Sequence, residues 1–148
     1  MSTRSENAEH LPPIERLQFE LAHPPYHAFL RPQAVSVDAD NGVVEIRLPF
    51  RPEFQRVPDK PEYHGGVIAG LMDLTAHATV AVKIGKMAPN IDLRIDYLRG
   101  AAATDLHARG ILRKRGRTLA LVDVEVRDDQ ARLIAVARGT LSTSYGPP

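Results

Sequence analysis

Residues 64–83 read HGGVIAGLMDLTAHATVAVK, and the fold prediction for the rest of the chain starts from this apolar segment. It contains no basic residue before its last position, and Gly85 follows closely. Two glycines open the segment, whereas a lysine and the later glycine end it as helix C-termini commonly end. Because apolar residues occupy every face, the segment is predicted to be one helix surrounded by other elements.

Polar residues interrupt the predicted helix at Asp73, Thr75, His77 and Thr79. An ionised carboxylate within an apolar shell costs several kcal/mol, roughly, unless it is paired or protonated. Asp73 is therefore a candidate functional residue, and the simpler interpretation is that it points to solvent. His77, one turn later, could be a core histidine, a partner for the carboxylate or a metal ligand. Without a third ligand nearby the metal signal is weak, so no metal site is predicted.

Composition excludes several classes of protein. The chain has 148 residues, the size of one domain, and a net charge of +1 without the basic footprint of a nucleic-acid-binding protein. It contains no cysteine, which excludes disulfides and a thiol nucleophile. The polar residues inside the apolar helix argue against a membrane span. The N-terminal residues MSTRSENAEH lack an apolar signal region, so a cytoplasmic location is expected.

The residues before the central helix predict short elements. An amphipathic pattern at 13–21 is typical of a peripheral helix, and a further helical turn is expected at 25–30. Alternating apolar residues predict strands at 34–39 and 43–48, joined by a turn at Asp40-Asn41-Gly42. Residues 49–63 are rich in proline and charge, so they are expected to form an irregular loop.

After the central helix, apolar and polar residues alternate. The pattern predicts four strands, at 91–97, 105–113, 122–127 and 133–141. Short turns are expected to join the last three strands. Small inward-facing residues such as Gly110 and Ala137 allow a helix to approach the sheet. The expected fold is α+β, with a curved antiparallel sheet wrapped around one long helix. One side of the helix and the sheet edges are expected to need a partner subunit.

The element order and the string His64-Gly65-Gly66, with Asp73 nine residues after the histidine, resemble the PaaI-like group of hot dog fold thioesterases. The turn Lys114-Arg115-Gly116-Arg117 is also similar to this group. The resemblance implies a hot dog domain at 33–148, preceded by an N-terminal segment with short helices at 1–32. It also implies an acyl-CoA thioesterase that releases free acid and CoA from a small or medium acyl- or aryl-CoA.

The glycines and the aspartate can be assigned chemistry. N–H groups at a helix N-terminus can stabilise an oxyanion, so Gly65 and Gly66, the latter in particular, are predicted to polarise the thioester carbonyl. Asp73 lies about 10–13 Å farther along the helix axis, too far to act on the same carbonyl. The resemblance implies a homodimer, or a dimer-of-dimers homotetramer, in which Asp73 of one chain faces Gly66 of another. Asp73 would act as general base or as nucleophile.

Further site residues follow from the same resemblance. His64 is expected to orient the loop through a backbone hydrogen bond or to touch substrate, and His77 to support Asp73. Basic residues at strand ends are expected to bind the phosphates of coenzyme A, namely Arg99, Arg113, Lys114, Arg115 and Arg117. No separate cofactor is expected, because coenzyme A is part of the substrate. Aromatic and sulfur-containing residues that could line the acyl pocket are Tyr26, Phe29, Phe50, Phe54 and Met72.

The chain departs from the family six residues before His64, where many relatives have an asparagine and this chain has Pro58. Gln55 or Asp59 could substitute for that asparagine. A hot dog hydratase or dehydratase would need a histidine and acid arrangement that is not found here. The alternative from another class is a non-catalytic acyl-CoA binding or sensor protein, which would have no need of Asp73.

Overall fold

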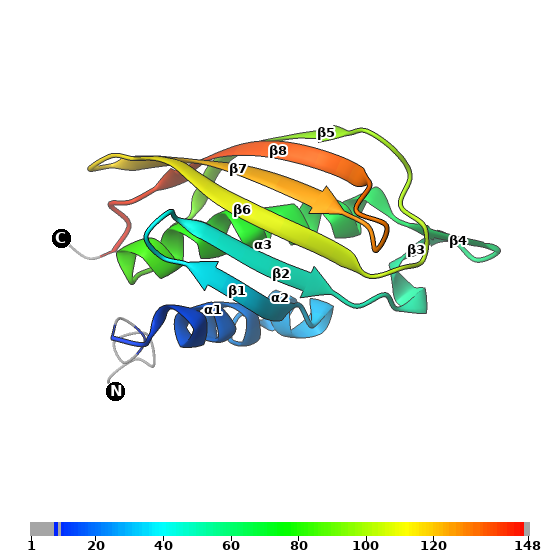
Figure 1. Ribbon diagram of the computed structural model, residues 1–148, viewed down its shortest axis with the longest axis horizontal. Coiled ribbons are helices and arrows are strands. Elements are labelled where there is room, and N and C mark those ends of the chain that lie inside the picture. The colour runs from blue at the N-terminus through cyan, green and yellow to red at the C-terminus, as the bar shows by residue number, and fades with distance from the viewer. Residues whose placement is uncertain (1–7, 9, 147–148) are drawn as a thin grey trace.

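The computed structural model describes residues 8 and 10–146 (Figure 1). Its elements follow in the order α1 (Pro13–Ala22), α2 (Pro25–Leu30), β1 (Gln33–Asp38), β2 (Val43–Leu48), the 3₁₀ turn η2 (Pro52–Phe54), β3 (Gln55–Val57), β4 (Lys60–Tyr63), α3 (Gly65–Ile84), β5 (Asn90–Tyr97), β6 (Leu106–Arg115), β7 (Leu119–Arg127) and β8 (Leu133–Ser142). The predicted central helix is confirmed to within one residue at each end. His64 caps its N-terminus, and Gly85 ends it in the left-handed conformation at φ 76°.

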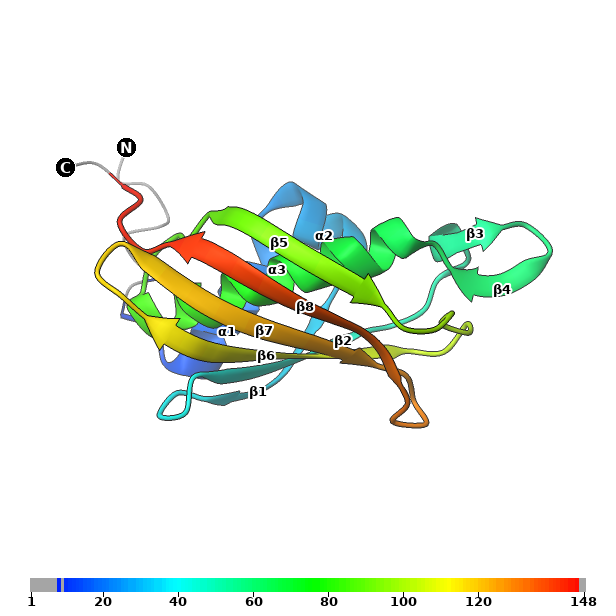
Figure 2. The same cartoon turned by 90° about the horizontal axis from the view of Figure 1, so that it is seen from above.

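Six strands form one antiparallel sheet in the order β1-β2-β6-β7-β8-β5, and α3 packs along one face of it (Figure 2). The predicted antiparallel sheet around a long helix is therefore confirmed. The last three strands are neighbours, as their short turns predicted. β5 does not pair with β6 but crosses to the far edge, where it pairs with β8. This places β5 at one edge of the sheet and β1 at the other.

The expectation of an irregular loop at 49–63 is wrong. These residues form η2 and a two-stranded hairpin of β3 and β4, in which Gln55 pairs with Tyr63 and Val57 with Lys60. The hairpin projects past the N-terminal end of α3 (Figure 2). Pro58 lies in its turn, where no ladder hydrogen bond is needed. A two-stranded ribbon tolerates prolines that a central strand would not, because each strand has one edge without a partner.

The helix α1 is part of the core, which corrects its prediction as a peripheral element. It packs against both α3 and β1 and buries Leu17 and Leu21. It also buries the charged side chains of Arg16 and Glu20. The central helix is thus covered by the sheet on one face and by α1 on one flank. By length and composition alone α3 could cross a membrane, but 56% of its apolar window is buried inside the domain.

The open part of α3 lies beside an exposed apolar strip. Gly66 and Asp73 are exposed on the helix, and the expectation that an apolar shell of the same chain surrounds Asp73 is wrong. Apolar side chains that are more than half exposed follow the edge strand β5 and its ends, namely Met87, Ile91, Tyr97 and Leu98. An exposed apolar strip at an unpaired strand edge is typical of an interaction surface.

α3 approaches the sheet closely at Gly110 of β6. A Cβ added to Gly110 would lie 2.0 Å from the Thr79 Oγ1 and 3.1 Å from the Thr75 Cγ2. Both threonines are buried, and their hydroxyls donate to carbonyl oxygens one turn earlier in the helix. The small residues in the sheet therefore allow the close packing that the sequence predicted, and these two polar helix residues are satisfied within α3.

Gly110→Ala is expected to lower the free energy of unfolding by about 1–3 kcal/mol, because the added methyl group overpacks the contact between α3 and β6. Urea denaturation at fixed pH measures this change. Gly100→Ala is the matched control, since a Cβ at Gly100 would have no atom within 4 Å. If the two variants were equally stable, the close contact at Gly110 would be refuted.

Candidate active site

The N-terminus of α3 carries the first predicted group of site residues. The Nδ1 of His64 accepts a hydrogen bond from the Gly66 N–H at 2.8 Å, so His64 is the side-chain cap of the helix. The ring therefore carries its proton on Nε2. This confirms that His64 orients the local backbone, as the sequence predicted.

The capping bond changes which glycine can serve a ligand. Gly66 was the preferred oxyanion donor, but its N–H is already bonded to His64. Within residues 8 and 10–146, no acceptor is bonded to the Gly65 N–H. The Tyr97 hydroxyl donates to the Gly65 carbonyl at 3.1 Å and thereby fixes the first turn of the helix. Gly65 is thus the residue whose N–H is free to bind a ligand oxygen.

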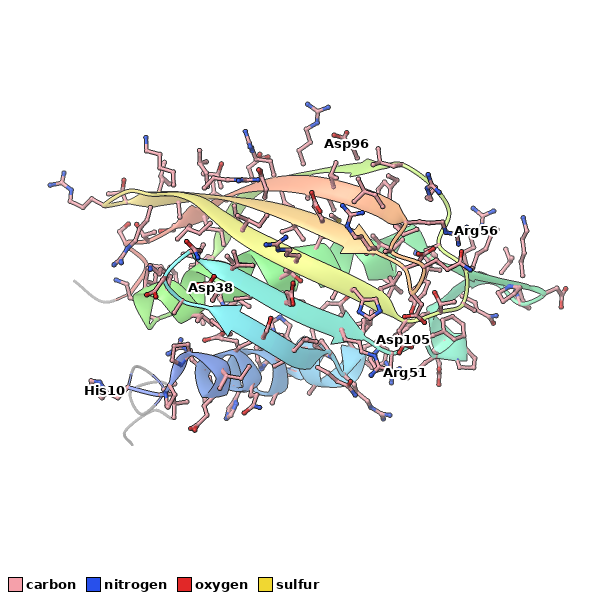
Figure 3. All side chains as sticks on the ribbon, viewed as in Figure 1. His10, Asp38, Arg51, Arg56, Asp96 and Asp105 are labelled. Carbon is pink, nitrogen blue, oxygen red and sulfur yellow. The ribbon has the colours of Figure 1, made fainter. Side chains whose placement is uncertain are left out.

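A depression of about 370 Å³ opens beside Gly65. Its walls include Tyr97 and the predicted coenzyme A ligand Arg99, together with Arg56 of the hairpin. Figure 3 shows Arg56 at the end of the molecule from which β3 and β4 project. A polar helix terminus with two cationic side chains nearby can attract an anionic group.

Asp73 lies on the same face of α3 as Gly66, two turns farther along. Its carboxylate is exposed, and its Oδ1 accepts a short hydrogen bond from the Nδ2 of Asn90. The same Asn90 nitrogen donates to the Asp73 carbonyl at 3.1 Å. The amide of Asn90 therefore holds one carboxylate oxygen and leaves the Oδ2 open. Such an arrangement presents a fixed carboxylate to a substrate or a water.

His77 was expected to support Asp73 directly, but the hydrogen bonds of its ring go elsewhere. Its Nδ1 lies 2.9 Å from the Ala88 carbonyl oxygen, and its Nε2 lies 2.9 Å from the Glu20 Oε2. The other oxygen of Glu20 accepts from Arg16, whose Nη1 also donates to the Gly85 carbonyl at 2.8 Å. Both ring nitrogens of His77 face oxygens, so the doubly protonated imidazolium satisfies both contacts.

The contact between Glu20 and His77 shifts the pKa values of both groups. Burial lowers the pKa of His77, but the hydrogen bond and the charge of Glu20 outweigh burial, so the pKa rises above its ordinary 6.5. Burial raises the pKa of Glu20, but the hydrogen bond and charge of His77, with help from Arg16, lower it below its ordinary 4.5. Each group thus stabilises the charged form of the other.

These shifts make stability depend on pH. The contribution of His77 is fully present below pH 6.5 and is lost as pH rises through its folded pKa, whereas that of Glu20 is present above pH 4.5 and is lost as pH falls through its folded pKa. We therefore expect the pair to stabilise the fold most between pH 4.5 and 6.5. Urea denaturation across pH tests this, and Glu20→Gln should flatten the fall above pH 6.5. An equally steep fall in the variant would refute the assignment.

The predicted coenzyme A ligands lie at two opposite ends of the folded molecule. Arg99 lies beside Gly65, as described above. The other four, Arg113, Lys114, Arg115 and Arg117, lie in or beside the β6–β7 turn, at the opposite end of α3 (Figure 1). Three of them line a shallow depression with Lys83 from the last turn of α3. Arg113 is also paired with Asp123 at 2.7 Å. One chain therefore cannot bring all five to one ligand.

The candidate acyl-pocket residues also separate. Phe54 and Met72 are fully buried, so they belong to the core. Tyr26 and Phe29 are more than half exposed on α2, and the Tyr26 hydroxyl lies over Gly70 of α3. Among residues 8 and 10–146, no group of three or more histidine and carboxylate side chains could hold a metal ion.

Asn90, Glu20 and Arg16 were missed as site residues. Asn90 begins a strand and sits 17 residues after the aspartate it holds, and Glu20 is 57 residues from His77. No motif spacing marks either contact. Arg16 and Glu20 are each about 100° around the helix from the leucine that follows them, outside the apolar face, so the sequence does not mark them as buried.

Part of the chain matches a known protein family. Residues 63–135 match the family model of the thioesterase superfamily. The medium/long-chain acyl-CoA thioesterase YigI of Escherichia coli K12 is 32% identical over 93 residues, which cover 52% of this chain and 59% of that protein. The chain thus spans about three fifths of the length of this relative.

Solved structures agree with this match. A protein described as a member of the thioesterase superfamily superposes with a TM-score of 0.82 at 25% identity, covering 88% of this chain and 97% of that chain. The PaaI protein of Escherichia coli superposes with a TM-score of 0.76 at 21% identity, covering 90% of this chain and 97% of its own. Residues 63–135 therefore match the thioesterase superfamily, and the chain has the hot dog fold.

Proposed function

We propose that this chain is an acyl-CoA thioesterase whose active site is completed by a second copy of the chain. The observation that carries the proposal is the exposed carboxylate of Asp73, which Asn90 fixes on the open face of α3. An open carboxylate oxygen beside a thioester can act as general base or as nucleophile. The likeness to a relative named as an acyl-CoA thioesterase supports coenzyme A as the leaving group.

A second copy is needed because of the distance between the two groups. Gly65 and Asp73 are eight residues apart on one helix, or about 12 Å along its axis. If two α3 helices pack antiparallel through their open faces, Gly65 of each lies near Asp73 of the other. The helix residue midway between them is Ala69, whose small side chain permits close approach. The exposed strip on β5 would be covered by the same association.

The antiparallel arrangement also accounts for the divided basic residues. A copy that runs in the opposite direction carries its own β6–β7 turn toward the end of the molecule that holds Gly65. Arg99 of one chain and the turn of the other would then flank one entrance. The nucleotide phosphates of coenzyme A fit such a cluster, because guanidinium groups bind phosphate through charge-assisted hydrogen bonds.

In the proposed reaction, the Gly65 N–H binds the thioester carbonyl oxygen and stabilises the oxyanion. Asp73 from the other copy acts on the carbonyl carbon in one of two ways. As general base it takes a proton from water, hydroxide adds to the carbon, the C–S bond breaks, and the thiolate of coenzyme A takes the proton from Asp73. As nucleophile it forms an anhydride with loss of the thiolate, and water then hydrolyses the anhydride.

The first test is thiol release from a panel of short, medium, long and aryl acyl-CoA esters. We expect turnover of at least one member by the wild type and its loss in Asp73→Ala. No turnover of any member by the folded protein, with acyl-CoA still bound, would overturn the enzyme assignment in favour of a binding protein. Equal turnover by the two proteins would remove Asp73 from the site.

The joint change Arg115→Gln and Arg117→Gln is expected to raise KM for an acyl-CoA more than it lowers kcat, because phosphate binding lies far from the reacting carbonyl. Steady-state kinetics measures both quantities. The change Arg94→Gln and Arg132→Gln removes the same charge from exposed positions away from the turn and serves as control. A KM that matches the control would remove the β6–β7 turn from the proposed binding site.

A further inference from the structure

Three ionisable side chains are packed between α1 and α3 without an evident need for them. Arg16 and Glu20 have 5% and 6% of their surface exposed, and His77 lies against them. Buried ion pairs lose much of their attraction to desolvation, and apolar residues of similar volume often stabilise a fold equally well. Stability alone is therefore a weak reason for this cluster. The residues that the cluster holds in place give a stronger reason for its presence.

Four hydrogen bonds link the cluster to Asp73 by way of the residues that connect α3 to β5. Glu20 holds the Nε2 of His77, and the Nδ1–H of His77 donates to the Ala88 carbonyl at 2.9 Å. Ala88 is fully buried in the connection between α3 and β5, two residues before Asn90. The amide of Asn90 then donates to both the carbonyl and the carboxylate of Asp73. The connection is thus tied to α3 at two points one helical turn apart.

The two ties lie close together in the connection between α3 and β5. Asn90 begins β5 and pairs with Leu141 of β8, and the register of the two strands shifts directly after it. The Pro89 carbonyl also accepts a hydrogen bond from the Ser142 N–H at 2.9 Å. The Oδ1 of Asn90 is buried and has no partner among the described residues, which leaves its Nδ2 as the only hydrogen-bonding end of its amide. The bond from His77 to Ala88 adds a side-chain constraint two residues before Asn90.

We propose that His77, held as an imidazolium by Glu20, is a positioning residue that fixes Ala88 and thereby keeps the Asn90 amide on the carboxylate of Asp73. This inference rests on the proposed function, in which Asp73 is the catalytic acid–base group or nucleophile. His77 touches neither substrate nor the reacting atoms. Its effect on turnover passes through the α3–β5 connection.

The charged surroundings of His77 give the proposal a pH dependence. Glu20 and Arg16 face it from α1, the ring of His27 faces it from α2 at 6.4 Å between centroids, and Asp73 lies one turn away on α3. The connection to β5 contributes the neutral groups of Ala88 and Asn90. When the imidazolium loses a proton, one of its two contacts loses its donor. We therefore expect kcat to fall as pH rises above the ordinary pKa of histidine.

A double-mutant cycle tests the route. Glu20→Gln and Asn90→Ala are each expected to lower kcat by about 10- to 100-fold with little change in KM, because a displaced catalytic group loses rate rather than binding. The double variant should be no slower than Asn90→Ala alone, since both substitutions interrupt the same series of contacts between Glu20 and Asp73. Independent, multiplying losses would overturn the proposal. His107→Gln, which breaks a surface pair with Asp129, is the matched control and should leave kcat unchanged.

The pH profile separates positioning from a general structural role. In Glu20→Gln the fall of kcat at high pH should move to lower pH, because the imidazolium has lost its carboxylate. A fall that stays where it is in the wild type would overturn the proposal. A stability defect alone would appear as a loss of folded protein over the same pH range, which circular dichroism measures.

Nuclear magnetic resonance provides a readout that does not need activity. In the ¹⁵N-labelled wild type, the side-chain amide signals of Asn90 should shift with the same midpoint as the ring of His77, in a titration that extends above pH 6.5. Asn90 signals that do not shift as His77 titrates would overturn the inference, even if the enzyme were active. Conversely, absence of turnover with coupled signals would refute the proposed function and leave the structural link intact.

Discussion

Asp73→Asn is expected to lower kcat for the best acyl-CoA substrate by about 10²–10⁴-fold, the range that a general acid–base group usually contributes. Asparagine has the shape of aspartate, and its carbonyl oxygen can still accept the hydrogen bond from Asn90. The amide cannot take a proton from water or attack a thioester carbon. Steady-state thiol release measures the loss, and circular dichroism checks that the variant is folded.

Asp92→Asn is the matched control for this change. Asp92 lies two residues after Asn90 on the exposed edge strand and loses the same charge, yet it should keep wild-type turnover. A folded Asp73→Asn protein that is as active as the control would remove Asp73 from the mechanism. A single turnover of the wild type in ¹⁸O-water then separates the two roles, because only a nucleophilic carboxylate acquires the label.

Gly65→Pro is expected to lower kcat by about 10²–10³-fold, because proline deletes the N–H that we propose binds the carbonyl oxygen. The backbone accepts the change. Gly65 is the first residue of α3, a position that proline favours in helices. His64, at φ −66° and ψ 133°, already has the extended conformation that a following proline requires.

Gly65→Ala is the control, since alanine keeps the N–H. Its Cβ would lie 3.6 Å from the Tyr97 ring, an ordinary contact. Steady-state kinetics on the two variants isolates the N–H from the side chain. Equal turnover would show that the Gly65 N–H does not bind the oxyanion.

The same two variants test whether the site is shared. A heterodimer of Asp73→Asn and Gly65→Pro chains contains one site with both groups intact and one site with neither. Mixing equal amounts of the two inactive proteins, with exchange of subunits, should restore about one quarter of wild-type turnover. If Gly65 and Asp73 acted within one chain, mixing would restore nothing.

Local patterns in the sequence predicted the main elements well, because each is specified by its own residues. The apolar run with its terminal glycines gave α3 to within one residue, and alternation gave the strands from β5 to β8. The hairpin of β3 and β4 was missed because its strands have three and four residues, too few to show a period. The prolines then argued for a loop, although they fit a ribbon that no other strand joins.

The site was predicted in part for the same reason. Asp73 stood out as a charge in an apolar run, and the two glycines stood out at a helix start. The preference for Gly66 over Gly65 depended on the direction of the His64 ring, which no pattern encodes. Asn90 and Glu20 reach their partners through tertiary packing alone. The catalytic roles of all these residues stay predictions.

The burial of Arg16 and Glu20 also bears on where the independently folding unit begins. The sequence placed a boundary between an N-terminal segment at 1–32 and a domain at 33–148. A fragment that starts at residue 33 would keep every strand and the whole of α3. It would also leave His77 without its counter-ion and expose the leucine contacts of α1. The smallest fragment expected to fold as the full chain does therefore begins at or before Pro13.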